Sequence, residues 1–143
     1  MDMKRLMTGT IVGGILLFAL GYLFYEMLLA DFFAANAGSA TGVWRETPIY
    51  WAVLVGELMM AALVTMAIDK MGASSMAAGA KVGAILGFMV WFSVDFIYYG
   101  LANFSNLTAT MVDPVVEIVR VGIVGAGIAM VLAKTATTST TDY

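Results

Sequence analysis

The chain has 143 residues, of which 62% are hydrophobic and 12% charged, with a net charge of −3 and neither cysteine nor histidine. A water-soluble domain carries about 25% charged residues, so this composition favours a lipid bilayer, where side chains that face lipid need no polarity. The missing cysteines exclude disulfides and thiolate metal ligands. The missing histidines remove the commonest general base, and the lack of a basic face argues against a nucleic-acid partner.

The apolar stretches predict an all-α fold, a bundle of four transmembrane helices over about residues 8–30, 48–68, 77–102 and 114–133. Each stretch is near the ~20 residues that cross a ~30 Å hydrocarbon core. Pro48 and Pro114 suit the first turn of a helix, and the short polar connections predict antiparallel neighbours. We therefore expect one domain over residues 1–134, followed by a flexible cytoplasmic tail over 135–143.

The positive charges predict the orientation of the bundle. Loops on the cytoplasmic side carry an excess of lysine and arginine, and only Arg45 falls on the opposite side when the N-terminus is placed inside. The residues on the predicted cytoplasmic side are Lys4, Arg5, Lys70, Lys81 and Lys134. The sequence thus predicts a multi-pass plasma-membrane protein with both ends in the cytoplasm.

Glycines spaced by four residues mark two of the predicted helices. Such spacing places small residues on one helix face and lets two backbones approach closely. The predicted helix-packing residues are Gly9 and Gly13 in the first helix, and Gly79, Gly83 and Gly87 in the third. The pattern Gly9-x-x-Val12-Gly13 recurs as Gly79-x-x-Val82-Gly83. Either a tandem repeat of two-helix units or the ready matching of apolar sequences explains this recurrence.

Ionisable residues inside the predicted spans form the candidate site. They are Glu26, Glu57, Asp95, Glu117 and Arg120. A charge at the bilayer centre costs about 2.5–3.5 kcal/mol, so such side chains face the bundle interior or a wet cavity. Counting 1.5 Å per residue from the helix ends predicts that all five lie in the outer half, with Arg120 roughly 9 Å beyond Pro114. Four acids opposite one arginine predict bound protons, water or a cation.

Aromatic residues accumulate in the same region. Trp and Tyr at the membrane boundary belong to the ordinary interfacial belt, but Tyr22, Trp91 and Tyr98 lie deeper and join the candidate site. Carboxylates beside aromatic faces suit organic cations. The sequence therefore predicts a polar and aromatic site, facing outward, for a small cation, a proton or a small amphipathic ligand.

A family resemblance rests on three motifs: Gly21-Tyr22-Leu23-Phe24-Tyr25, Gly83-x-x-x-Gly87-Phe88 and Val112-Asp113-x-x-x-Glu117-x-x-Arg120. With these motifs the layout resembles small bacterial four-helix membrane proteins that are grouped as a domain of unknown function. The resemblance implies a bacterial inner-membrane setting and no particular activity. Small multidrug exporters offer an analogy, but they have one key glutamate in the first helix, whereas this chain spreads acids over all four helices.

Three classes of function compete. The first is a small transporter or binding protein for a cation, proton or amphipathic solute. The second is an accessory or scaffold subunit of a membrane complex, or a homo-oligomer, in which an Arg120-centred network only sets the helix registry. The third is a membrane enzyme, which the lack of histidine, cysteine and a recognisable nucleophile argues against. We expect no metal and no cofactor.

Overall fold

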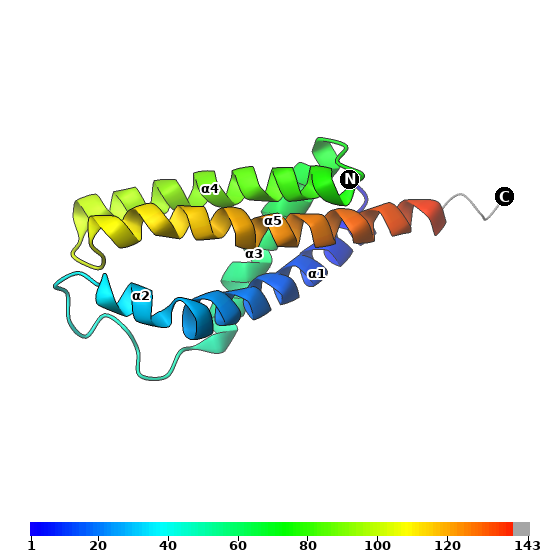
Figure 1. The fold of residues 1–143 in the computed structure, drawn as a ribbon. Coiled ribbons are helices and arrows are strands. Elements are labelled where there is room, and N and C mark those ends of the chain that lie inside the picture. Colours follow the sequence, from blue (N-terminus) through cyan, green and yellow to red (C-terminus); the bar gives the residue numbers. More distant parts are fainter. Residues whose placement is uncertain (139–143) are drawn as a thin grey trace.

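The computed structural model describes residues 1–138, and these residues fold into a bundle of helices (Figure 1). The helical segments are α1 (Met3–Gly21), the π-helix η1 (Tyr22–Leu28), α2 (Ala30–Ala35), α3 (Tyr50–Lys70), α4 (Met76–Leu101) and α5 (Leu107–Thr138). The described part contains four segments long and apolar enough to cross a membrane: Met3–Leu28, Tyr50–Lys70, Met76–Leu101 and Leu107–Thr135. The all-α fold and the multi-pass membrane class therefore agree with the prediction. The predicted tail begins inside α5, and its residues 139–143 lie outside the described part.

The predicted start of the last helix at Pro114 is wrong. The helix begins at Leu107, and Pro114 lies inside it. Asn106 caps the new start, since its side-chain oxygen accepts a hydrogen bond from the Ala109 amide at 3.0 Å and so satisfies one of the free donors of the first turn. A proline within a helix lacks one intrahelical hydrogen bond, and here the helix continues on both sides of it.

The bundle has two distinct ends (Figure 1). The start of α1, the turn between α3 and α4, and the last turns of α5 lie together, and we name this the Arg5 end. The connections 36–49 and 102–106 lie at the opposite end, which we name the loop end. There the Gly38 amide donates to the Phe104 carbonyl at 2.8 Å, and the Asn106 amide donates to the Asn36 carbonyl at 3.0 Å. Backbone hydrogen bonds thus join the two connections to each other.

Helices α4 and α5 lie side by side along their length (Figure 1), and small residues bring their backbones into contact. Gly79 lies against Gly125, Gly83 against Val121, and Gly87 against the backbone of Glu117. A Cβ atom added to Gly83 would overlap the Val121 carbonyl oxygen. Glycine is therefore required there for this helix spacing, as in small-xxx-small packing generally.

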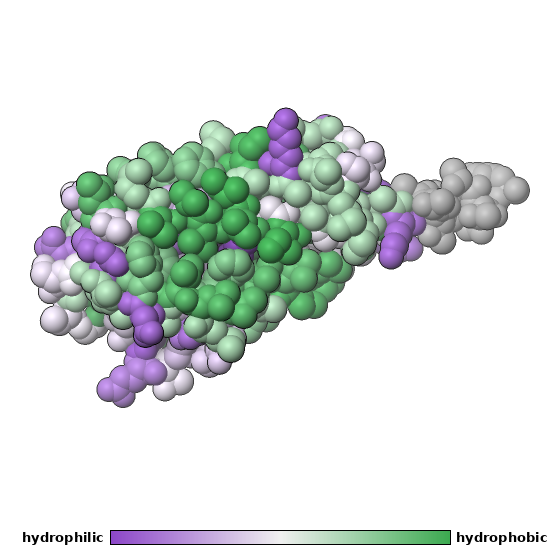
Figure 2. All heavy atoms as spheres, in the orientation of Figure 1, coloured by the Kyte–Doolittle hydropathy of each residue, from purple (hydrophilic) through white to green (hydrophobic). Residues whose placement is uncertain are grey.

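Helix α1 packs on α3 and α5 through its own glycines. Gly9 lies against Thr65, and Gly13 lies against Ala61 and Ile128. The apolar core follows the same contacts and contains fully buried side chains from α1, α3 and α5: Leu17, Ala61, Val64, Val121, Val124 and Ile128. On the face of the molecule shown in Figure 2, apolar side chains cover the middle, and hydrophilic side chains gather towards the ends. This distribution is what a bilayer requires of a spanning bundle.

Candidate functional site

Arg120 ties three helices together in the centre of the bundle. Its guanidinium donates to Glu57 of α3 at 2.9 Å, to Glu117 of α5 at 2.8 Å, and to the Leu17 carbonyl of α1 at 3.0 Å. The Arg120 side chain is only 3% exposed. A guanidinium presents its donors in a fixed planar fork, so these three acceptors set the relative positions of α1, α3 and α5.

Tyr25 extends this network towards the loop end. Its hydroxyl oxygen lies 2.6 Å from Asp113 Oδ1 and 2.7 Å from Glu117 Oε1. Its ring also lies beside the Arg120 guanidinium, 5.8 Å from the ring centroid to Cζ, a favourable cation–π arrangement. Tyr25 therefore contacts both acids of α5 and the arginine between them.

The two short contacts of Tyr25 constrain where protons lie. A hydroxyl has one hydrogen to donate, yet both oxygen–oxygen distances are in the range of strong hydrogen bonds. Glu117 Oε1 already accepts from Arg120, so the ionised form suits Glu117. If Tyr25 donates to Glu117, the contact with Asp113 is a hydrogen bond only when Asp113 carries a proton and donates it to the tyrosine oxygen.

Asp95 brings a fourth carboxyl group into the cluster. It is half-buried on α4 and lies near Asp113 and Glu117. Its Oδ2 atom is buried and has no hydrogen-bond partner among the described residues, and the same holds for Glu117 Oε2. Buried acceptors without donors are costly, which is a second reason to expect added protons or a bound cation here.

We name the set Glu57, Asp95, Asp113, Glu117, Arg120 and Tyr25 the acid cluster. Asp113 lies six residues after the first residue of α5 and Arg120 thirteen, so at 1.5 Å per residue they are roughly 9 Å and roughly 20 Å from the start of this helix. Arg120 is thus deeper than the roughly 9 Å estimated from Pro114, because α5 begins at Leu107. The cluster is a column from near the loop end to the middle of the bundle.

The structure places Glu57, Asp95, Glu117 and Arg120 near one another. It leaves other predicted site residues apart. Glu26 is exposed, and Tyr22 and Tyr98 are 56% and 52% exposed. The Tyr98 ring lies on Phe104, 5.6 Å between centroids.

Trp91 lies one turn before Asp95 on α4 and is half-buried. Its indole Nε1 is buried with no acceptor among the described residues. Residues one turn apart share a helix face, so Trp91 flanks the acid cluster on the side of Asp95.

Tyr25 and Asp113 were absent from the predicted site. The stripe formed by Asp113, Glu117 and Arg120 on one helix face was visible in the sequence, but the late start assigned to the helix placed Asp113 outside it. Tyr25 lies in the π-helix η1, where the Leu29 amide donates to the Phe24 carbonyl at 2.8 Å. Tyr25 follows Leu17 and Gly21, which lie against Arg120, at intervals of four residues, whereas the neighbouring Glu26 is exposed.

Among residues 1–138 no group of three or more carboxyl ligands has the arrangement to hold a metal ion. The acids are instead spread along the bundle axis and interleaved with Arg120 and Tyr25. Comparison with known proteins finds no matching family model, no matching curated protein and no matching solved structure. The resemblance to a bacterial family therefore has no support from these comparisons.

Proposed function

We propose that this small membrane protein binds and releases protons at the acid cluster and couples that exchange to the movement of a small cation across the bilayer. The observation that carries the proposal is the position of the Tyr25 hydroxyl between Asp113 and Glu117, at 2.6 and 2.7 Å. One hydroxyl hydrogen cannot serve both carboxylates, so the pair holds a further proton. Such a proton is exchangeable, because the neighbouring carboxyl of Asp95 can accept it.

The balance of charge supports the same proposal. Four carboxyl groups of the cluster face the single guanidinium of Arg120, so full ionisation would leave three uncompensated negative charges within a bundle that carries a net charge of −3 overall. Buried unpaired charges are strongly unfavourable, and intramembrane acids with this excess are typical of proton relays. A small cation can replace a proton here with little change in charge.

We further infer the orientation and the setting. The Arg5 end faces the cytoplasm, because the lysine and arginine excess lies there and only Arg45 lies in the connection at the loop end. Alternate helices then cross in opposite directions, and the acid cluster opens towards the outer side. A plasma membrane of a bacterial cell fits this layout, and so does a tandem arrangement of the hairpins α1–α3 and α4–α5.

Proton flux in vesicles tests the function. The purified chain is reconstituted with a pH-sensitive dye inside, and sodium, potassium or ethidium is applied as an outward gradient. The parent protein is expected to acidify or alkalinise the lumen with at least one of these cations, and Asp95→Asn and Glu57→Gln are expected to abolish that flux. Asp31→Asn is the matched control, since Asp31 is an exposed acid of α2 away from the cluster. Equal flux in all variants contradicts the proposal.

A second function has one observation in its favour. Arg120 is satisfied by acceptors from three helices, which is what an accessory subunit needs to hold its shape for a partner or for a second copy. If the protein is such a subunit, only substitutions of Arg120, Glu57 and Glu117 affect its structure. Asp95→Asn and Asp113→Asn then leave both its stability and the flux in vesicles unchanged. The vesicle assay therefore separates the two functions.

A further inference from the structure

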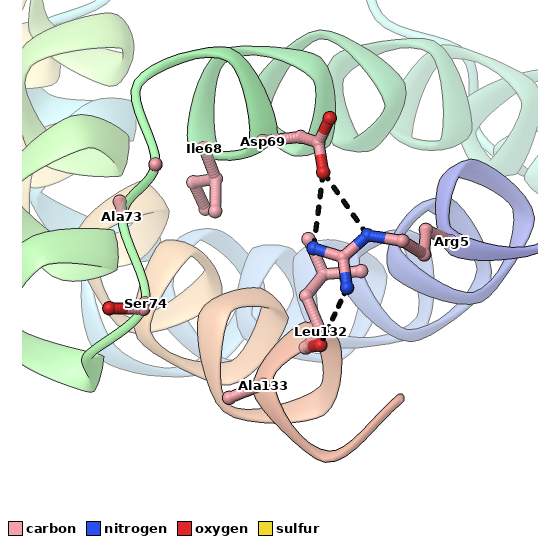
Figure 3. Close-up of a pocket in the computed structure, with 8 residues that line it drawn as sticks. Arg5, Ile68, Asp69, Ala73, Ser74, Leu132 and Ala133 are labelled. Carbon is pink, nitrogen blue, oxygen red and sulfur yellow. Dashed lines mark hydrogen bonds and ion pairs between the residues drawn. The ribbon is translucent and has the colours of Figure 1, made fainter. Parts of the chain in front are cut away.

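The Arg5 end carries a second polar cluster, remote from the acid cluster. Arg5 of α1 donates through Nε and Nη2 to Asp69 Oδ1, at 3.1 Å each, and through Nη1 to the Leu132 carbonyl at 2.9 Å. Asp69 is in the last turn of α3 and Leu132 is near the end of α5 (Figure 3). One side chain thus joins the ends of three spanning helices, the same three that Arg120 joins in the middle.

The Arg5 cluster is partly exposed, and buried apolar side chains lie directly behind it. The side chains of Arg5 and Asp69 are 27% and 18% exposed. Beside them lies a cavity of about 130 Å³, also lined by Ile68, Ala73 and Leu132 (Figure 3). That volume holds a few water molecules. Ile68 and Leu132 are 1% and 2% exposed, so the cavity ends on packed apolar side chains.

The path from this cavity to the acid cluster is closed by the core. Val64 and Ile128 are fully buried between the two polar clusters, and Gly13 brings α1 directly against Ala61 and Ile128. A tight apolar layer excludes water, yet its closure depends on α1, α3 and α5 staying together at the Arg5 end. The contacts that hold them there are charged and partly hydrated, a kind of contact that breaks far more easily than a buried one.

We propose that Arg5, Asp69 and the Leu132 carbonyl form a latch that closes the acid cluster to the Arg5 side of the membrane and opens to expose it there. This inference rests on the proposed function, since a proton or cation taken up at one side must leave at the other. With the latch closed, the acid cluster communicates only with the loop end. With the latch open, the ends of α1, α3 and α5 part, and water enters past Ile68 and Leu132.

A single cysteine reports the opening directly, because the chain has none of its own. Val64→Cys places a thiol of similar size in the closed layer, seven residues from Glu57 on the same face of α3. In sealed vesicles of known orientation, a membrane-impermeant thiol reagent is added from either side. We expect slow labelling in the Val64→Cys parent. Arg5→Gln and Asp69→Asn should each speed labelling from the Arg5 side at least about tenfold, since the loss of even one charge-assisted hydrogen bond has that effect.

Lys4→Gln is the matched control, because it removes a positive charge from the neighbouring position, where the side chain is exposed. It should leave the labelling rate unchanged. A second measurement needs no change to the latch: raising the salt concentration screens partly exposed ion pairs, so labelling of the Val64→Cys parent should accelerate with salt.

Unchanged labelling in both latch variants and at high salt overturns the proposal, as does faster labelling from the loop end. Because the labelling rate of a thiol at position 64 does not depend on proton exchange at the acid cluster, a failed latch and a failed proton site are distinguishable. Faster labelling together with no cation-driven flux supports the latch and rejects the proposed function.

Discussion

Replacing either of two acids of α5 by its amide should lower the stability of the protein to very different extents, although Asp113 and Glu117 are one helical turn apart and share Tyr25. If Asp113 carries the further proton of the pair, Asp113→Asn should change the free energy of unfolding by less than about 1 kcal/mol, since an amide then replaces the acid as donor to the tyrosine oxygen. Glu117→Gln should cost about 3 kcal/mol. The difference follows from which of the two carboxyl groups carries the proton.

The larger cost comes from two sources in the structure. Glu117 Oε1 accepts from Arg120 at 2.8 Å and from Tyr25 at 2.7 Å, and replacing the carboxylate by a neutral amide oxygen weakens each of these bonds by about 1 kcal/mol. Glu117 Oε2 is buried without a donor, so its replacement by an amide nitrogen leaves buried hydrogens without an acceptor, a further penalty of about 1 kcal/mol or more. Glu57 still neutralises Arg120, which keeps the total near the lower end of the 3–5 kcal/mol typical of a wholly stranded charge.

Equilibrium unfolding in mixed micelles, followed by tryptophan fluorescence and circular dichroism, measures these free energies. Infrared difference spectroscopy adds an independent observation, because a protonated carboxyl has a carbonyl band that Asp113→Asn should remove and Glu117→Gln should retain. A loss of stability in Asp113→Asn equal to that in Glu117→Gln would refute the reasoning, since it would show that Asp113 is needed as a charged group. Retention of the carbonyl band in Asp113→Asn would refute it independently.

Two further substitutions test the packing and the arginine network by the same unfolding measurement. Arg120→Lys should cost about 3 kcal/mol or more, because a single ammonium cannot reproduce the planar fork that reaches α1, α3 and α5; a change below about 1 kcal/mol would contradict this. Gly83→Ala should lower the free energy of unfolding by about 1–3 kcal/mol, because the added methyl group would push α4 away from the Val121 carbonyl oxygen. Gly56→Ala, where an added Cβ meets nothing within 4 Å, should be neutral or slightly stabilising, and equal effects at the two glycines would contradict the packing argument.

The sequence predicts most of the fold because spanning helices are recognised by length and apolarity alone. The segments of α3 and α4 start and end within two residues of their predicted limits. The start of α5 was missed because Pro114 and the polar residues before it look like a loop, whereas Asn106 already supplies the cap. Composition and proline position cannot reveal a cap that depends on one side-chain hydrogen bond.

The site was predictable to the extent that charges in a membrane must face inward. That rule places Glu57, Glu117 and Arg120 correctly within the bundle, but it does not apply where a residue is close to the helix end. Glu26 lies only two residues before the end of η1 and is exposed. Tyr25, unlike Tyr22, shares a helix face with Leu17 and Gly21, which lie against Arg120, but the sequence alone does not show that this face meets the acids of α5.

The π-helix η1 also makes the first span the part of the chain where residue number is most strictly constrained. A π turn contains one residue more than the α turn that it replaces, so deleting one residue just before Tyr25 would turn its side chain by about 100° relative to α1. The polypeptide would stay apolar, helical and long enough to span, and α1 would keep its own contacts with α5 through Gly13 and Leu17. The phenol, however, would leave its two acids, so the number of residues between Leu17 and Tyr25 is constrained by the acid cluster.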